Sequence, residues 1–179
     1  MTNVHHNIIS ANYGGSQAFD TDDGSSWYDI HHNFLFDSDG FKMDYAGHNS
    51  TFHDNLVAVK PYDGQNCMNG DENAPWQNNT CIIMGAMLGH TGDVNGPHQD
   101  IVGNFDCKFN ANHTSWTAAW DLKNNTYMTP NGNASLPCGV SVAAAAASGS
   151  GVEEGSSAHR LPTDDELIAM ARALLGMEK

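Results

Sequence analysis

The sequence predicts an all-β solenoid, built from short strands that recur along the chain. Three segments near its start share one pattern, NVHHNII, DIHHNFL and TFHDNLV. Asp22 lies eleven residues before Asn33, and Asp44 lies eleven residues before Asn55, so the period is 22 residues. Repetition at about 20 to 50 residues is typical of stacked repeats, each of which buries its apolar face only against its neighbours. The 18 glycines, the many asparagines and the 16% of charged residues are typical of a turn-rich β protein.

The first two repeats each contain more than one short strand. Residues 3–9 form the first expected strand, and a second alternation of apolar and polar residues follows a glycine-containing turn at 18–22. The second repeat follows the same plan, with residues 28–36 and 41–45 separated by the turn DSDG. The 22-residue register gives these aligned pairs: Phe19 with Phe41, Asp20 with Lys42, Asp22 with Asp44, Ser26 with His48, and Ile30 with Phe52.

The rest of the chain is less regular. The third repeat starts with TFHDNLVAV at 51–59 and continues into a long polar segment at 60–80, which we expect to be a loop extruded from the stack. The apolar run CIIMGAML at 81–88 predicts the second strand of a further repeat. In QDIVGNFDC, at 99–107, Asn104 again fits the asparagine position of the repeat.

These patterns divide the chain into three parts. A solenoid domain is expected over 1–140, irregular from about residue 110. The low-complexity segment 141–162 predicts a flexible linker. Residues 163–179 predict a helix, because Thr163 and Glu166 have the spacing of a capping box and an apolar stripe follows.

The start of the chain predicts a fragment. No signal peptide is visible, since MTNVHHN lacks both a basic start and an apolar core. The chain also begins inside a repeat, whereas solenoids need atypical terminal units that cover their ends. We therefore expect upstream repeats and a cap that this sequence does not contain.

The charge and cysteine content limit the classes of partner and compartment. The net charge is −14, from 7 basic and 21 acidic residues, and it repels nucleic acids and anionic membrane surfaces. We expect no nucleic-acid partner and no membrane insertion. Four cysteines and five N-x-S/T sequons favour a secreted glycoprotein with disulfides, although four cysteines leave three pairings open. The sequons are at Asn49, Asn78, Asn112, Asn124 and Asn133.

The recurring asparagine predicts a structural ladder. Asparagine tolerates left-handed backbone angles and forms hydrogen bonds along a stack of identical turns. The residue three positions earlier in each repeat is apolar, and we expect it to face inward. The asparagines of this series are Asn7, Asn33, Asn55 and Asn104, and the matching apolar row is Val4, Ile30, Phe52 and Ile101.

Two neighbouring columns carry histidine. The first holds His5, His31 and His53, and the second holds His6, His32 and Asp54. Metal sites need ligands that converge on one point, whereas a ladder points its side chains in parallel. We therefore predict structural or surface histidines without a bound metal, and a zinc site is the alternative.

The acidic column is the main candidate for chemistry. Asp20, Asp22 and Asp23 lie on the first repeat and Asp44 on the second, so Asp22 and Asp44 are expected about 5 Å apart through the strand spacing. Carboxylates at about 5 to 5.5 Å act as nucleophile and acid/base in retaining glycosidases. Mutual repulsion pushes one of them toward its protonated form. A solvated acidic stripe and a calcium site are the alternatives.

The same residues carry a resemblance. AFDTDDGSSWYDIHHNFLF and DGFKMDYAGHNSTFHDNLV resemble right-handed parallel β-helix proteins of the pectate-lyase-like superfamily, including β-helix glycoside hydrolases. The resemblance covers about residues 3–107, and it implies coils of three short parallel strands with a groove for polysaccharide. It also implies that Asp22 or Asp23 is an acid or nucleophile, with Asp44 as partner. Arginine occurs only at Arg160 and Arg172, in the tail, so lyase chemistry is disfavoured.

The combined expectation is a secreted, carbohydrate-active parallel β-helix protein with glycoside hydrolysis as its activity and a polysaccharide as its ligand. Four aromatic side chains are expected to stack on sugar rings: Trp27, Tyr28, Tyr45 and Trp76. Apart from the calcium alternative, no cofactor is expected. The alternatives are a non-catalytic glycan-binding or surface-adhesion protein, and a truncated remnant without activity. The expected substrate-binding residues are Asp20, Lys42, His48, Trp27 and Tyr45.

Overall fold

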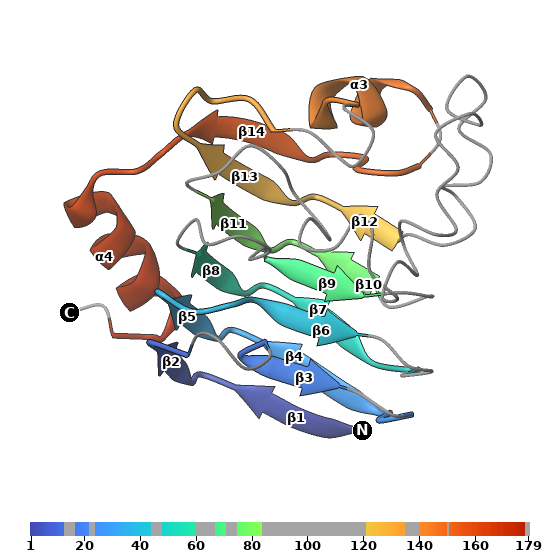
Figure 1. Cartoon of the computed structure of the whole chain (residues 1–179), viewed down its shortest axis with the longest axis vertical. Coiled ribbons are helices and arrows are strands. Elements are labelled where there is room, and N and C mark those ends of the chain that lie inside the picture. The colour runs from blue at the N-terminus through green and yellow to red at the C-terminus, as the bar shows by residue number, and fades with distance from the viewer. Residues whose placement is uncertain are drawn as a thin grey trace.

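A computed structural model describes most of the chain, and the statements below concern the residues that it describes (Figure 1). These residues are 1–12, 17–21, 24–43, 48–59, 67–70, 75–83, 121–134, 140–149 and 151–177.

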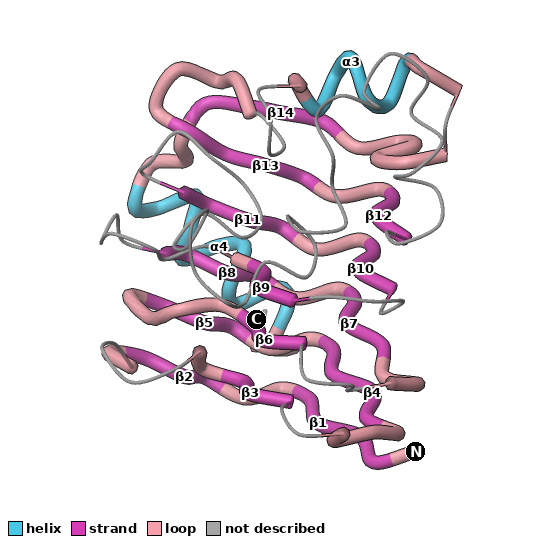
Figure 2. Tube along the Cα trace, turned by 45° about the vertical axis from the view of Figure 1, so that its right-hand side comes forward, coloured by secondary structure: helices cyan, strands magenta, loops and turns pink. Residues whose placement is uncertain are grey.

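The described chain is mostly β, and its strands form three parallel sheets (Figures 1 and 2). Successive repeats contribute neighbouring strands, so each sheet runs along the stack of repeats. The first sheet has the order β1 (Thr2–His5), β4 (Tyr28–His31), β7 (Thr51–His53), β10 (Pro75–Gln77), β12 (Asp121–Lys123). The second has the order β2 (Ile8–Ser10), β5 (Phe34–Phe36), β8 (Leu56–Val59), β11 (Thr80–Ile83), β13 (Thr126–Thr129), β14 (Ser157–Arg160). The third has the order β3 (Phe19–Thr21), β6 (Phe41–Met43), β9 (Met68–Gly70).

The register predicted from the 22-residue period is confirmed wherever the pairs are described. Phe19 pairs with Phe41, and Asp20 pairs with Lys42 in the third sheet. The predicted alignments of Ser26 with His48 and of Ile30 with Phe52 are also found. Because parallel strands lie about 4.8 Å apart, each column of the alignment becomes a row of stacked side chains.

The core fills the space between the three sheets. Its central row consists of Ile30, Phe52, Trp76 and Leu122, which are register partners along the first sheet and are all buried. Phe41 enters from the third sheet and meets Phe52 and Trp76 with edge contacts at centroid distances of 5.5 and 5.3 Å. Burying each large apolar side chain contributes about 1.5 to 3 kcal/mol, so this row is the main apolar support of the stack.

The predicted asparagine ladder is present inside this core. Asn33 Nδ2 donates to Asn55 Oδ1 at 3.1 Å, and Asn55 Nδ2 donates to Asn79 Oδ1 at 3.0 Å. Each amide also donates to backbone carbonyls, for example from Asn55 to Ile30 at 2.9 Å. Asn7 and Asn125 extend the ladder at its two ends. Asn104 and Ile101 lie outside the described residues.

The left-handed residue of each turn is the one before the ladder asparagine. Positive φ angles occur at His6, His32, Asp54, Asn78 and Asn124, between 53° and 57°. We expected the asparagine itself to adopt the left-handed angle, and this was wrong, because the residue before it does so. The ladder residue instead satisfies buried backbone groups with its side chain, while the exposed or half-buried residue before it takes the strained angle.

Two segments predicted as irregular contain regular strands. The segment 60–80, expected as an extruded loop, includes β9 and β10, and β10 supplies the buried Trp76. The region from about residue 110 contains β12 and β13 in register with the earlier repeats. Their polar composition concealed them, because only one or two inward side chains per short strand need to be apolar.

The predicted linker at 141–162 was also wrong, since this segment contains α3 (Val142–Ala147) and β14. Val142 and Val152 are buried, so small apolar side chains attach the segment to the end of the core. The predicted C-terminal helix is confirmed as α4 (Asp164–Leu174), which starts with the expected capping box between Thr163 and Glu166. Helix α4 packs against the outer face of the second sheet (Figure 1).

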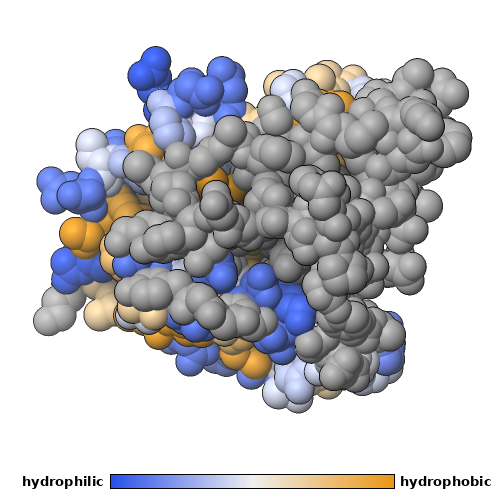
Figure 3. Space-filling model, viewed as in Figure 1, coloured by the Kyte–Doolittle hydropathy of each residue, from blue (hydrophilic) through white to orange (hydrophobic). Residues whose placement is uncertain are grey.

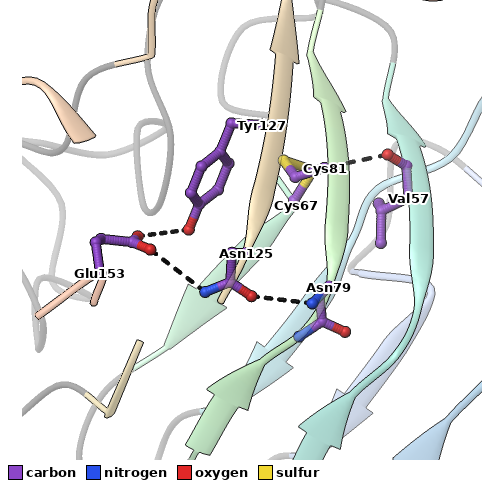
Figure 4. Close-up of a disulfide and its surroundings, with 7 residues drawn as sticks. All are labelled: Val57, Cys67, Asn79, Cys81, Asn125, Tyr127 and Glu153. Atoms are coloured by element: carbon purple, nitrogen blue, oxygen red, sulfur yellow. Dashed lines mark hydrogen bonds between the residues drawn. A yellow bond between two sulfur atoms is a disulfide. The ribbon is translucent and has the colours of Figure 1, made fainter. Parts of the chain in front are cut away.

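Disulfide formation, predicted from the cysteine count, is confirmed for one pair. Cys67 and Cys81 are bonded inside the core, beside Val57 (Figure 4). The bond links residues 14 positions apart and joins the residue before β9 to β11. Cys107 and Cys138 lie outside the described residues.

Candidate functional site

The outer face of the third sheet carries two of the predicted binding residues. Phe19 and Phe41 stack on the core side with ring centroids 5.2 Å apart, so the alternating Asp20 and Lys42 face outward. Lys42 Nζ lies 3.4 Å from Asp20 Oδ1, and the side chains of Lys42 and Asp20 are 13% and 32% exposed. The register thus creates an ion pair between adjacent repeats.

Trp27 and His48 lie together at the corner between the third and first sheets. Ser26 pairs with His48, and the backbone N–H of Trp27 donates to the His48 carbonyl at 3.4 Å. The Trp27 side chain is 56% exposed, and its φ angle is 67°. A bulky residue at a positive φ angle is a backbone outlier, and such outliers concentrate at functional sites.

The paired carboxylates remain a prediction. Asp22, Asp23, Asp44 and Tyr45 lie outside the described residues. The residues directly before the two key aspartates are described, and Thr21 and Met43 are register partners in the third sheet. The calcium alternative depends on the same aspartates and is likewise untested.

Two further aromatic residues, Trp76 and Tyr28, differ in exposure. Trp76 is 1% exposed, because it occupies the inward row of the first sheet between Phe52 and Leu122. The expectation that Trp76 stacks on a sugar ring was therefore wrong. Tyr28 is half-buried and packs against the same core.

The histidine columns form a stack on the outside of the first sheet. His31 stacks on His5 and on His53 with centroid distances of 5.0 and 5.1 Å. In the second column, His6 and His32 stack at 5.3 Å. This is the surface role that we predicted for these residues.

Each histidine also contacts its neighbour in sequence. His5 Nδ1 lies 2.7 Å from His6 Nδ1, and His31 Nδ1 lies 2.8 Å from His32 Nδ1. One ring of each pair must donate and the other must accept, because two protonated Nδ1 atoms cannot share a hydrogen bond. Each pair therefore holds at most one positive charge while this contact is kept.

The third position of the column adds two carboxylates. His53 Nε2 donates to Asp29 Oδ1 at 2.9 Å, and His53 Nδ1 donates to Asp54 Oδ2 at 2.6 Å. The Thr51 hydroxyl donates to Asp29 Oδ1 at 2.7 Å. With both ring nitrogens facing carboxylates, His53 is arranged as an imidazolium.

These contacts move the pKa values of neighbouring groups in opposite directions. The pKa of His53 is raised: burial lowers it most strongly, but the hydrogen bonds and charges of Asp54 and Asp29 together outweigh burial. The pKa of His31 is lowered, chiefly by burial and also by the charge of His53, against the attraction of Asp29. The pKa of Asp29 is lowered, first by the Thr51 hydroxyl and then by His53. His53 therefore keeps its positive charge to a higher pH than the His31 ring that stacks on it.

The zinc alternative for the histidine columns stays a prediction. Among the described residues, no group of three or more His, Cys, Asp or Glu side chains has a metal-binding arrangement.

A buried carboxylic acid ends the asparagine ladder (Figure 4). The Tyr127 hydroxyl donates to Glu153 Oε1 at 2.5 Å, and Asn125 Nδ2 lies 3.4 Å from Glu153 Oε2. Glu153 is fully buried, and burial raises its pKa despite hydrogen bonds from Ser156, Tyr127 and Asn125. Burial and the Glu153 carboxylate raise the pKa of Tyr127 well above its usual value.

Sequence reasoning missed Asp29 and Glu153 as interacting groups. Asp29 alternates with Ile30 in a strand whose inward residue is apolar, so its outward position beside His31 was available from the pattern. Glu153 had no such signal, because it lies in the segment that composition assigned to a linker.

Comparisons with known proteins give no relative: no family model, no curated protein and no solved structure matches this chain. Within the described part of the chain, no helix is both long and apolar enough to cross a membrane.

Proposed function

We propose that the chain is a right-handed parallel β-helix that binds a polysaccharide along the outer face of its third sheet. Three parallel sheets that share one set of repeats support the β-helix interpretation. Parallel crossover connections are right-handed in about 98% of cases, which supports the handedness.

One observation carries the binding proposal: the register aligns Asp20 with Lys42 on the outside of the third sheet, with the exposed Trp27 at the adjoining corner. The Asp20 carboxylate, which is 32% exposed, offers hydrogen-bond acceptors to sugar hydroxyls, and the less exposed Lys42 holds it in place. An exposed indole offers a flat surface for the apolar face of a sugar ring. His48 and Tyr45 complete the proposed binding residues.

Hydrolysis is the second candidate function. Thr21 and Met43 are partners in the sheet and the last residues of their strands, and in the sequence each is followed by an aspartate, Asp22 or Asp44. A continued register would bring the two carboxylates to about 5 Å, the separation used by retaining glycosidases. Asp23 is the alternative acid or nucleophile. The one described disulfide and the sequons support secretion.

A pull-down assay with insoluble plant and algal polysaccharides tests the binding proposal. Trp27→Ala and Lys42→Gln are each expected to reduce the bound fraction severalfold. Lys123→Gln is the matched control, because Lys123 also pairs with an aspartate, Asp121 at 3.1 Å, but on the first sheet. Equal binding by all three variants would contradict the proposal.

Release of reducing sugar tests the hydrolysis proposal. Asp22→Asn and Asp44→Asn are each expected to abolish release while binding persists. If wild-type protein binds a polysaccharide but releases no sugar from it, the chain is a binding protein without this activity.

A further inference from the structure

A groove separates helix α4 from the turns between the first and second sheets. It has a volume of about 270 Å³. One wall is polar and includes His32, Asp54, Asn78 and Thr80. The other wall is apolar and comes from α4, with Met170 and Leu174. Figure 3 shows apolar side chains, in orange, on the side of the molecule where α4 packs.

Asn78 is both a wall of this groove and the acceptor residue of a sequon. The sequence Asn78-Asn79-Thr80 matches N-x-T, and the Asn78 side chain is exposed at a turn with a φ angle of 56°. Glycan attachment requires an exposed asparagine in a surface turn, and Asn78 meets this condition.

The Asn78 amide is already oriented. Its Nδ2 donates to Asp54 Oδ1 at 3.1 Å, and Asp54 is held in turn by His53. Nδ2 has two hydrogens, and one of them suffices for the bond to Asp54. The other hydrogen can be replaced without loss of this contact.

We propose that Asn78 carries an N-linked glycan whose first N-acetylglucosamine sits in the groove against α4. The sugar would come from a polyprenyl-pyrophosphate-linked oligosaccharide. Asn78 Nδ2 bonds to C1 of the sugar and loses one proton, while the bond from C1 to the pyrophosphate oxygen breaks and the pyrophosphate leaves with the bonding electrons. This proposal depends on entry into a secretory pathway but not on polysaccharide binding.

The chemistry of the groove fits a single sugar ring. The C–H face of the ring meets Met170 and Leu174, and its hydroxyls meet the opposite wall. His32 engages His31 through Nδ1 only, which leaves Nε2 for a sugar hydroxyl. Thr80 adds a hydroxyl to the same wall.

Asn124 provides a matched control within the same chain. It occupies the next position of the same column, in the identical sequon Asn-Asn-Thr, with a φ angle of 54°. It is also exposed. Its side chain lies against Gly155, and it does not line the groove.

The test uses two full-length chains produced by secretion from a eukaryotic host. One keeps only the Asn78 sequon and the other only the Asn124 sequon, with the remaining sequon asparagines changed to glutamine. Endoglycosidase trimming leaves one sugar on each, and the same chains from the bacterial periplasm supply the unglycosylated references. Peptide mass spectrometry measures occupancy, and thermal unfolding measures stability.

Occupancy of Asn78 and a rise in Tm of roughly 2 to 4 °C from its single sugar are expected. The Asn124 chain should show no comparable rise. Nuclear Overhauser contacts between the sugar ring and the Met170 methyl group are expected only in the Asn78 chain, and Met170→Ala should remove the Tm rise.

Three results would overturn the proposal: a vacant Asn78, an occupied Asn78 without sugar contacts to Met170, or an equal Tm rise from Asn124. The Overhauser measurement decides the question even if Met170→Ala does not fold. Polysaccharide pull-down of the Trp27→Ala variant remains a separate test, so failure of the two proposals can be distinguished.

Discussion

The asparagine ladder inside the protein and the histidine column outside it follow one register, but they tolerate different residues. Asn33, Asn55, Asn79 and Asn125 are all buried, and one residue type recurs at each step. The outer column starts with histidines and then continues through Gln77, Lys123 and Glu154. With the same strand spacing, the buried column therefore keeps one residue type, whereas the exposed column accepts several.

The cause of this difference is solvent. A buried ladder residue must satisfy a backbone N–H on one side and carbonyls on the other, and only a short amide both donates and accepts in that space. An exposed side chain that loses its partner is hydrated instead. A substitution in the buried ladder should therefore lower the free energy of unfolding much more than a substitution at an exposed position.

Asn55→Ala should have the largest effect. The change removes a donor to Ile30 and Asn79 and an acceptor for the Asn33 N–H, all inside the core. Each buried group left without a partner costs about 1 to 3 kcal/mol, so a loss of about 3 kcal/mol or more in the free energy of unfolding is expected. Urea denaturation measures it.

Asn7→Ala is the control for this substitution. Asn7 is the exposed end of the ladder and donates to Asn33 and His5. Because water can replace these bonds, the expected loss is below about 1 kcal/mol. Similar losses at both positions would show that burial does not control the value of the ladder.

Replacing Cys67 and Cys81 together by alanine tests a second internal support. The disulfide closes a loop of 14 residues, and loops of this length contribute about 3 kcal/mol by restricting the unfolded chain. Equilibrium unfolding of the double variant should show a loss of this order. Reduction of the wild-type protein should reproduce it, and an unchanged midpoint would contradict this role.

The sequence predicted the side-chain columns well in the first repeats, but it did not predict how these columns continue in the later ones. Repeats that follow one another at 22 residues gave the correct partners, such as Ile30 with Phe52. The fourth and fifth ladder residues, Asn79 and Asn125, escaped prediction because they follow the preceding ladder residue by 24 and by 46 residues, and neither interval keeps the period of 22. The pairing of such distant residues is visible only in the hydrogen bonds of the folded chain, and a residue pattern does not reveal it. The pairing of Asp22 with Asp44 stays a prediction.

Glu153→Gln tests how the ladder ends. The pKa of Glu153 is raised by burial, so the folded protein holds a proton that the unfolded chain releases near pH 4.5. Stability from this group is complete below that pH and is lost as pH rises through the raised folded pKa, by at most about 1.4 kcal/mol per pH unit. The variant should lack this slope. Unfolding measured across pH 4 to 8 decides, and equal slopes would contradict a buried titrating acid.

His53→Gln should have the smallest effect, because the ion pairs of His53 with Asp29 and Asp54 are about one-third exposed. Such pairs contribute below about 1 kcal/mol.

The raised pKa of His53 means that its contribution is complete below pH 6.5 and is lost as pH rises through the folded pKa. His31 has a lowered pKa, so its contribution is present above pH 6.5 and is lost as pH falls through its folded pKa. Nuclear magnetic resonance should show His53 titrating at higher pH than His31, and His53→Gln should raise the pKa of His31 by removing a neighbouring charge. Coincident titration of the two rings would mean that hydration, and not the column, sets their protonation. His159→Gln, at an exposed histidine of β14, should leave both titrations unchanged.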